Sequence, residues 1–428
     1  MKFTNELVPQ SFRKSLTGPL RLMYVVTFIN AIGSGLTLSF FVIYLHNVRH
    51  FSTAFSTTLL AAAALVSLII GPLWGTLVDR FGPAPVGIAG LATDAVVLLW
   101  WGHVTTPTAA ITAALALAAV GGAGYGPTST MLARLCHDDL QHAFGFNFML
   151  LNLGIGFGGL ISATIVDLHH PVTFTILYTV NATVTLVSAA LLLRLWRYGQ
   201  AIPREERDRH AESGWRTVLH DRRLVRYVIA AIVLITGGYG SQEAGYSLFV
   251  VNKVHLTVHL IGVIFFFNTS TIVVAQLFTL SLIQGRSRTR VLAVVGVLWA
   301  LFWVSLDLAL HLPALWAFVV LAISMSVFAF GETMLSPVGP ALVNEIAPEH
   351  LRGRYNAAAG LSWGLSGTVA PLLVAVYFGH HLGTWWPLST ALTALLGSAL
   401  MLSLRRHLSP VEDGRTPAVS EDEGALDA

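Results

Sequence analysis

The sequence predicts an all-α integral membrane protein whose twelve transmembrane helices form two pseudo-symmetric six-helix halves. The first observation is composition, because 54% of the 428 residues are hydrophobic and only 11% are charged, far from the average of soluble proteins. The second is a series of apolar segments of roughly 20 residues or more, the length that crosses about 30 Å of hydrocarbon. The third is an internal repeat, which indicates a duplicated membrane domain.

Twelve apolar segments follow one another along the chain. The first six lie near residues 21–46, 54–79, 84–103, 107–134, 144–168 and 172–195. The second six lie near residues 225–251, 258–284, 290–310, 314–343, 354–379 and 384–404. An even number of crossings places both termini on the same side of the membrane.

The distribution of positive charge predicts which side that is. Of the 25 Lys and Arg residues, only Arg49 and Lys253 fall on the side opposite the termini. Cytoplasmic loops carry the excess of positive charge in membrane proteins. We therefore expect a multi-pass plasma-membrane protein with cytoplasmic N- and C-termini, and the preference for arginine over lysine is typical of a GC-rich bacterial genome.

The internal repeat has a constant offset of 210 residues. Four pairs of glycine or proline residues are in register at equivalent helices, namely Gly35 with Gly245, Gly75 with Gly285, Pro127 with Pro337, and Gly154 with Gly364. The two six-helix halves are therefore predicted to span residues 1–195 and 225–408. Between them, residues 196–224 form a central cytoplasmic loop with an amphipathic stretch around Trp215 that is expected on the membrane surface. Residues 409–428 form an acidic tail predicted to be disordered.

Two motifs of soluble enzymes occur in the sequence but fall within predicted helices. Residues 154–159 match G-x-G-x-x-G, yet no strand precedes them, as dinucleotide binding requires. Residues 360–364 match G-x-S-x-G, yet the esterase motif needs a strand-to-helix turn. The basic residues form no continuous face or recognition motif for nucleic acid. We therefore expect no enzymatic activity, no bound cofactor and no nucleic-acid partner.

Histidines are concentrated at the predicted external ends of helices. Ten of the sixteen lie there, namely His46, His50, His103, His169, His170, His255, His259, His311, His380 and His381. They have no carboxylate or cysteine partners at ligand spacing, so the sequence predicts no metal site. Interfacial anchoring or pH sensing is the favoured interpretation.

Ionisable residues inside the membrane are costly and are therefore functional candidates. Four acids lie within predicted helices, namely Asp94, Glu243, Asp307 and Glu332, and no Lys or Arg lies deep in any of them. A cavity with acids and no fixed bases attracts cations, tolerates neutral amphiphiles and repels anions. The favoured ligand is therefore a lipophilic small molecule that is cationic or neutral.

The turn between the second and third segments carries the most specific motif. Residues Gly75 to Gly82 read G-x-x-x-D-R-x-G. This pattern resembles the signature loop of the major facilitator superfamily, the twelve-helix secondary transporters. The resemblance implies the major facilitator fold and a cytoplasmic gate in which Asp79, next to Arg80, pairs with Arg134 at the end of the fourth helix. The family's basic residues after the second glycine are replaced by proline and alanine here.

In that family the first and fourth helices of each half line a central cavity, which favours Glu243 and Glu332 over Asp94 and Asp307. The segments Gly331–Pro337 and Ala347–Tyr355 resemble the tenth-to-eleventh-helix region of proton-coupled multidrug exporters. The resemblance implies that Glu332, helped by Glu243, handles protons and substrate. Further polar and aromatic cavity candidates are Asn30, Tyr246, Gln276 and Trp363.

Two marks of drug/proton antiporters are missing. The fourth-helix arginine has no counterpart between Ala113 and Ala119, and glycine stands where the fifth-helix signature has proline, at Gly158–Gly159. The favoured prediction is nevertheless proton-coupled export of hydrophobic cationic or neutral molecules by alternating access, with protons as the coupling ion and membrane lipids as neighbours. The alternatives are a proton-coupled symporter that imports a neutral solute and a non-transporting membrane receptor for a lipophilic ligand.

Overall fold

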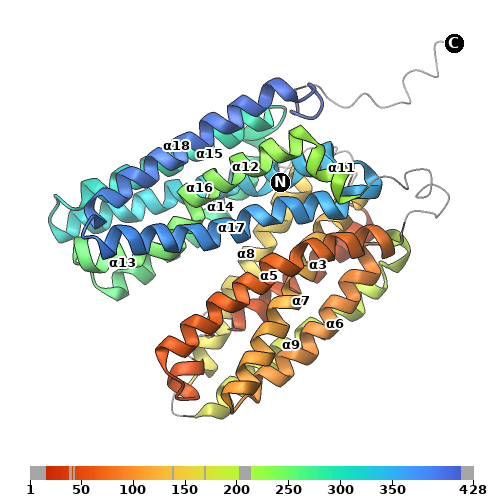
Figure 1. The fold of residues 1–428 in the computed structure, drawn as a ribbon, viewed down its shortest axis with the longest axis horizontal. Helices are drawn as coiled ribbons and strands as arrows, with labels where there is room; N and C mark the ends of the chain where they lie inside the picture. The colour runs from red at the N-terminus through yellow and green to blue at the C-terminus, as the bar shows by residue number, and fades with distance from the viewer. Residues whose placement is uncertain are drawn as a thin grey trace, which may run out of the picture.

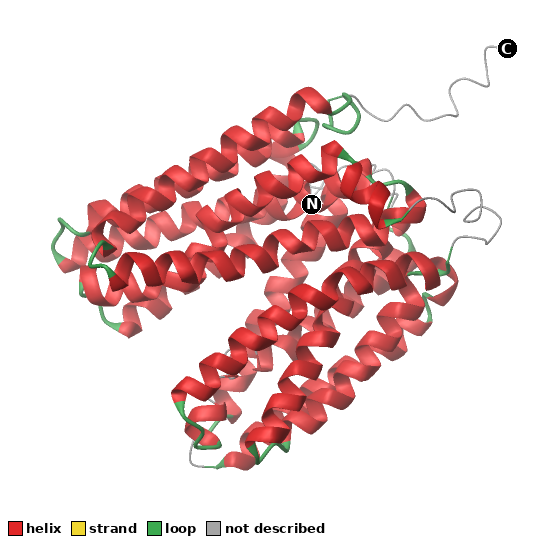
Figure 2. Ribbon diagram, viewed as in Figure 1, coloured by secondary structure: helices red, strands yellow, loops and turns green. Residues whose placement is uncertain are grey.

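The computed structural model describes residues 16–37, 41, 44–136, 139–167, 170–201 and 214–415. Within these ranges the chain is helical and contains no strand (Figure 2). Twelve helices in the described part of the chain are long and apolar enough to cross a membrane. The predicted fold class is therefore confirmed.

The first half contains six of these helices. They are α3 (Gly18–Thr37), α5 (Thr53–Phe81), α6 (Pro83–Gly102), α7 (Pro107–Leu135), α8 (Leu140–Ile165) and α9 (Pro171–Leu193). Three begin with proline, whose missing N–H costs nothing in the first turn. The residues that match G-x-G-x-x-G lie in the interior of α8, so they do not form a phosphate-binding turn.

The second half contains the other six. They are the broken helix that starts as α12 (Arg222–Ile235) and ends at Val254, followed by α14 (Val258–Ile283), α15 (Arg288–Ala309), α16 (Ala314–Ile346), α17 (Arg352–Gly379) and α18 (Trp386–Leu404). The residues that match G-x-S-x-G lie in the interior of α17. They therefore lack the strand-to-helix turn of an esterase.

The seventh transmembrane helix is irregular, which the sequence analysis did not predict. After α12 it passes through π-helical turns at Thr236–Gly240, Gln242–Tyr246 and Val250–Val254, with the short α13 (Ser247–Phe249) between them. Such π turns often occur at functional sites. Glu243 lies in the second of these turns.

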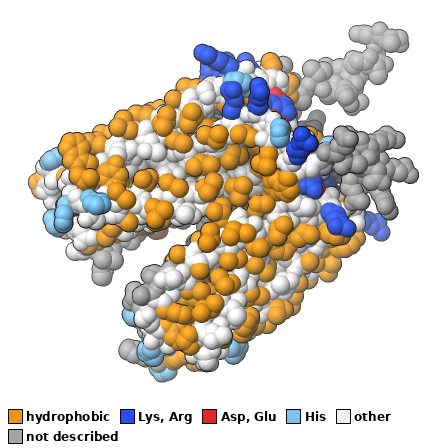
Figure 3. All heavy atoms as spheres, in the orientation of Figure 1, with side chains coloured by type: hydrophobic (Ala, Val, Ile, Leu, Met, Phe, Trp, Pro, Cys, Tyr) orange, Lys and Arg blue, Asp and Glu red, His pale blue; other side chains and the backbone are white. Residues whose placement is uncertain are grey.

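The two halves form separate groups of helices that meet along α5, α7 and α8 on one side and α14, α16 and α17 on the other (Figure 1). We call the end that carries the α5–α6 turn, α11 (Trp215–His220) and the end of α18 the terminal face. The halves are in contact there and diverge toward the opposite face. Figure 3 shows the resulting hollow between them, with Lys and Arg gathered at the terminal face and His at the opposite tips.

Small residues allow the helices of each half to approach closely. A Cβ atom at Gly35 of α3 would clash with the backbone of Ile155 in α8, and one at Gly158 of α8 would clash with the backbone of Ile32. This is the small-residue packing typical of membrane helices. It explains Gly154 and Gly158 of α8 without a ligand.

The C-terminal segment Ser409–Arg415 corrects the prediction of disorder for the start of the tail. Its Asp413 is fully buried and accepts hydrogen bonds from Ser287 Oγ at 2.7 Å and from Thr289 N and Oγ1 at 2.9 Å. The carboxylate thus caps the N-terminus of α15, a contact that the acidic composition of the tail does not reveal. Residues 416–428 lie outside the described chain.

The central loop places a short helix on the terminal face, and residues 202–213 lie outside the described chain. In α11, Val218 is buried, and Trp215 Nε1 donates to Thr76 Oγ1 of α5 at 2.8 Å. Leu219 is exposed. The apolar side of the predicted amphipathic stretch is therefore covered in part by protein.

Candidate functional site

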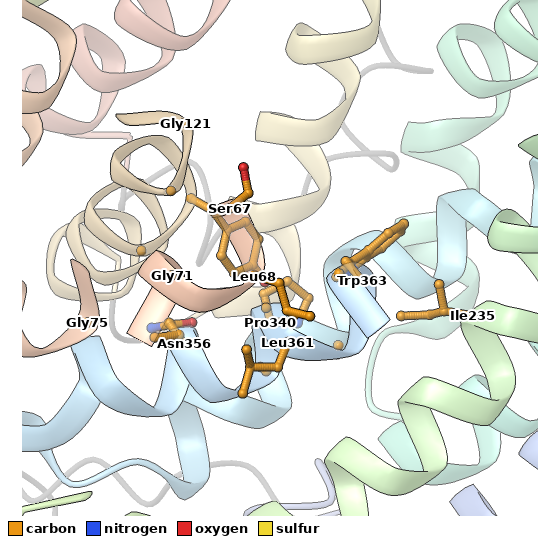
Figure 4. Close-up of a pocket in the computed structure, with 18 of the residues that line it drawn as sticks. Ser67, Leu68, Gly71, Gly75, Gly121, Ile235, Pro340, Asn356, Leu361 and Trp363 are labelled. Atoms are coloured by element: carbon orange, nitrogen blue, oxygen red, sulfur yellow. The ribbon is translucent and has the colours of Figure 1, made fainter. Parts of the chain in front are cut away.

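A cavity of about 660 Å³ lies between the two halves (Figure 4). Helices α5, α7 and α8 line it from the first half, and α12, α16 and α17 with Tyr239 line it from the second. Aromatic side chains contribute much of the wall, namely Trp74, Tyr125, Phe148, Tyr227, Tyr239 and Trp363. A concave, mostly apolar chamber with a few polar groups is typical of a small-molecule site.

Glu332 is the one Asp, Glu, Lys, Arg or His side chain among the described residues that line this cavity. It lies in α16 and is 4% exposed. Asn268 Nδ2 of α14 donates to Glu332 Oε2 at 2.7 Å, and the Tyr239 side chain interacts with the same carboxyl group. The carboxyl group is therefore held by two polar partners from two neighbouring helices while one side borders the cavity.

Tyr239 connects Glu332 to the aromatic wall. Its ring lies 5.0 Å from Trp363, 5.6 Å from Trp299 and 5.7 Å from Phe328, measured between centroids. Such ring contacts hold a side chain in one orientation. The phenol is thus fixed next to the carboxyl group, and Trp363, 43% exposed, is free to contact a ligand.

Glu243 lies near Glu332 but not in the wall of the cavity. Its side chain is exposed, and it interacts electrostatically with both Glu332 and Tyr239. The structure therefore brings the two predicted acids into one electrostatic environment. Asp94 and Asp307 are partly buried and line neither this cavity nor the second one described next.

A second cavity of about 350 Å³ lies mainly within the first half, adjoins the first cavity and also borders Ser336 and Pro340 of α16. Its lining includes Asn30 from α3 and Asn147 from α8, and it shares Tyr125, Phe148 and other residues with the first cavity. Thr27 Oγ1 donates to Asn147 Oδ1 at 2.7 Å. Asn30 therefore lies in the wall of the second cavity and not of the first.

Two of the predicted cavity residues lie elsewhere. Gln276 is fully buried and donates to the carbonyl of Thr333 at 3.2 Å, between α14 and α16. Tyr246 is fully buried, and its ring stacks on Phe302 at 5.5 Å inside the second half. Both predictions are wrong, because periodicity shows that a helix has an inner face but not which neighbour covers it.

Asp79, the residue predicted to form a gate, is part of a clamp between the halves at the terminal face. Asp79, whose side chain is 5% exposed, accepts from Gly353 N at 2.7 Å and from Arg354 N at 3.2 Å, and forms a salt bridge with Arg354 Nη1 at 3.2 Å. A carboxylate at a helix N-terminus satisfies its free N–H groups and the helix dipole. Because a Cβ atom at Gly75 would clash with Gly353 and Ala357, the glycine is what allows α5 and α17 to approach.

The expected pair of Asp79 and Arg134 is replaced by this clamp. Arg134 Nη1 donates to the carbonyl of Gln200 at 2.6 Å, and Arg134 Nε lies 3.9 Å from Glu349. Arg80 is exposed, with its guanidinium 5.2 Å from the ring of Phe81. The correction has a physical reason, since the N–H groups at the start of α17 lie closer to Asp79 than the end of α7 does.

Gly82 ends α5 with φ +91°, a backbone conformation that favours glycine. A Cβ atom there would also meet the backbone of the segment after α9. The second glycine of the motif therefore serves the sharp turn into α6. Its role is structural, in support of the clamp.

Sequence reasoning missed Asn268, Tyr239 and Arg354. Asn268 was visible as a polar residue in an otherwise apolar helix, and Tyr239 lies four residues before Glu243. Arg354 belongs to the segment Ala347–Tyr355 that had already been singled out. Among the described residues, no group of three or more His, Cys, Asp or Glu side chains is placed to hold a metal ion.

Known proteins share this fold. A crystal structure of FucP in the outward conformation superposes with a TM-score of 0.72 at 15% identity, and one of the human organic anion transporter MFSD10 (TETRAN) with 0.69 at 14%; each comparison covers 92% of this chain and all of the other. At these identities the likeness shows the fold alone.

Sequence relatives are distant. The uncharacterised MFS-type transporter YdeE of Escherichia coli (strain K12) is 23% identical over 86% of this chain and 89% of its own. A Na(+), Li(+), K(+)/H(+) antiporter of Planococcus maritimus is 24% identical over 77% of this chain and 84% of its own. The family model of the Major Facilitator Superfamily matches residues 23–252 and 237–426. The chain therefore belongs to the Major Facilitator Superfamily of transporters.

Proposed function

We propose that the protein exports lipophilic cationic or neutral small molecules across the plasma membrane in exchange for protons. The observation that carries the proposal is the position of Glu332, the one acidic or basic side chain among the described residues that line a large aromatic cavity. A carboxyl group that binds either a proton or a cationic substrate couples the two. Anionic substrates are disfavoured, because none of the described lining residues is a cationic side chain that could balance their negative charge.

The clamp supports alternating access. With the terminal face in the cytoplasm, as the distribution of Lys and Arg favours, Asp79 closes the cytoplasmic side while the cavity communicates with the outer side. Export then requires the clamp to open so that a substrate can enter from the cytoplasm. Release of Asp79 from the start of α17 is the step that separates the two halves there.

The test is uptake of a fluorescent lipophilic cation into inverted vesicles that contain the purified protein. An imposed inside-acid pH gradient should drive accumulation, and Glu332→Gln should abolish it while the protein stays folded. Asp307→Asn is the matched control, because it also removes one intramembrane carboxylate but lies outside both cavities. Equal uptake by wild type and Glu332→Gln would refute the role of Glu332.

A second candidate is exchange of monovalent metal cations for protons, favoured by the named activity of the Planococcus relative. The same vesicles distinguish this activity from export of organic molecules. If the protein exchanges metal cations for protons, adding Na⁺, Li⁺ or K⁺ should dissipate the imposed pH gradient without any organic substrate. If a neutral solute and protons cross the membrane in the same direction, the protein is a symporter. Binding of the dye without labelled-substrate counterflow would indicate a receptor.

A further inference from the structure

Four basic side chains gather where α12 begins and α18 ends. Arg222 and Arg226 are one helical turn apart on α12, and Arg406 and His407 follow α18; all four are exposed. Nη1 of Arg226 lies 2.6 Å from Nε2 and 3.1 Å from Nδ1 of His407. We call these four residues the α12–α18 basic cluster.

The neighbouring acids are occupied by other partners. Asp221 accepts from Arg223 Nη2 at 3.0 Å and from the Tyr355 hydroxyl at 2.7 Å. Burial raises the pKa of Asp221, but these hydrogen bonds outweigh it and hold the pKa below its usual range. The acid is thus an ionised partner of Arg223 and not of the cluster.

The two acids of the C-terminal segment are occupied in the same way. Glu412 binds Arg223 and the backbone N–H of Ser409. Asp413 is 3.0 Å from Arg415 and 3.7 Å from Arg405 in addition to its cap on α15. Among the described residues, the arginines of the cluster therefore have no carboxylate partner in hydrogen-bond or salt-bridge contact.

An apolar strip continues from the cluster along the same two helices. Ile229, one turn after Arg226, is 51% exposed, and Leu402, one turn before Arg406, is 46% exposed. Helices α12 and α18 pack closely at this side, because Gly397 lies against Leu234. The surface thus combines positive charge at the terminal face with an apolar seam toward the membrane centre, which Figure 3 shows as the general pattern of this side.

We propose that the α12–α18 basic cluster binds the phosphate of an anionic phospholipid, with an acyl chain along Ile229 and Leu402. Guanidinium groups are preferred partners of phosphate. Basic side chains beside a membrane helix attract anionic lipids. A phosphate oxygen next to Arg226 and His407 accepts from both, whereas the two side chains alone require a neutral imidazole as acceptor. A lipid there joins the first and last helices of the second half.

The test measures lipid retained by the full-length protein. Delipidated protein in detergent is titrated with dioleoylphosphatidylglycerol or dioleoylphosphatidylcholine and examined by native mass spectrometry. We expect saturable binding of the anionic lipid and little of the zwitterionic one. Replacing all three arginines of the cluster by glutamine should lower the affinity for the anionic lipid by about 100-fold, because each arginine contributes roughly a factor of five to the affinity.

The matched control is a triple variant with the same change in charge, Arg21→Gln, Arg194→Gln and Arg197→Gln, at other exposed positions of the terminal face. An equal loss of affinity for the anionic lipid in both triple variants would overturn the proposal, because it would show that the lipid responds to the total surface charge and not to this cluster. An unchanged affinity in the cluster variant would overturn it as well. If the triple variant does not fold, the single variant Arg226→Gln replaces it. We expect its affinity for the anionic lipid to be about fivefold lower than that of the wild type.

Excess inorganic phosphate separates a lipid site from a site for soluble phosphate. We expect it not to displace the lipid, and we expect Ile229→Ser with Leu402→Ser to weaken lipid binding because the acyl contact is lost. Complete displacement by phosphate together with full binding by the serine variant would overturn the lipid assignment. The measurement contains no transported substrate, so its outcome is independent of the proposed transport function.

Discussion

Replacement of Asp79 by asparagine tests the clamp at the terminal face. The carboxylate receives two backbone hydrogen bonds and one salt bridge from the start of α17. Hydrogen bonds to charged groups contribute about 1.5–3 kcal/mol, and neutral ones about 1 kcal/mol. Asparagine keeps an acceptor oxygen but loses the charge, so the closed state should lose about 2 kcal/mol, or roughly 30-fold in its equilibrium with the open state.

The assay is the distance between spin labels on the two halves at the terminal face. Labels at Arg197→Cys and Arg290→Cys, both exposed, are introduced after Cys136, the single cysteine, is replaced by alanine. The Asp79→Asn variant should shift the distance distribution toward longer values. Arg80→Gln, which removes a neighbouring charge outside the clamp, is the control. An Asp79→Asn distribution identical to that of the control would refute the reasoning.

Four other predictions follow from the structure. Among competitors of equal size, cationic and neutral compounds should inhibit dye uptake at concentrations at least about tenfold lower than anions; stronger inhibition by anions would contradict the charge argument. Gly158→Val should lower the unfolding temperature in detergent, because the new side chain meets the backbone of Ile32. Asp413→Ala should cost about 3 kcal/mol, since buried donors lose their acceptor; an unchanged unfolding temperature would show that the cap is not formed. The depressed pKa of Asp221 contributes stability above about pH 4 that is lost as pH falls through the lower folded value, so Asp221→Asn should flatten this acid dependence of the unfolding temperature.

The fold was predictable from the sequence because membrane physics leaves few options. An apolar segment in lipid must satisfy its own backbone, so each long apolar stretch becomes a helix. The two halves were visible from the spacing of glycines and prolines such as Gly75 and Gly285. The irregular seventh helix was not predictable; in its first π turn Gly238 lies against Trp299 of α15, a contact between distant segments that the sequence does not show.

The site was predictable only in part. The cost of a carboxylate in an apolar helix singled out four acids, and the family resemblance ranked Glu332 among them. The structure places Glu332 in the wall of the cavity. The partners of a polar residue depend on the rotation of its helix, and this rotation is set by tertiary packing. For that reason Gln276 and Tyr246 were misplaced, and Asp79 was assigned Arg134 as its partner, whereas its partners come from the start of α17.

The cap that Asp413 places on α15 has a consequence for synthesis. The chain is made from its N-terminus, so α15 is complete more than a hundred residues before the carboxylate that caps it emerges. Until then the N–H group of Thr289 and the hydroxyl of Ser287 have no such acceptor. Translation of the segment after α18 therefore completes the second half, and a chain that stops after Leu408 should reach the membrane with the N-terminus of α15 uncapped.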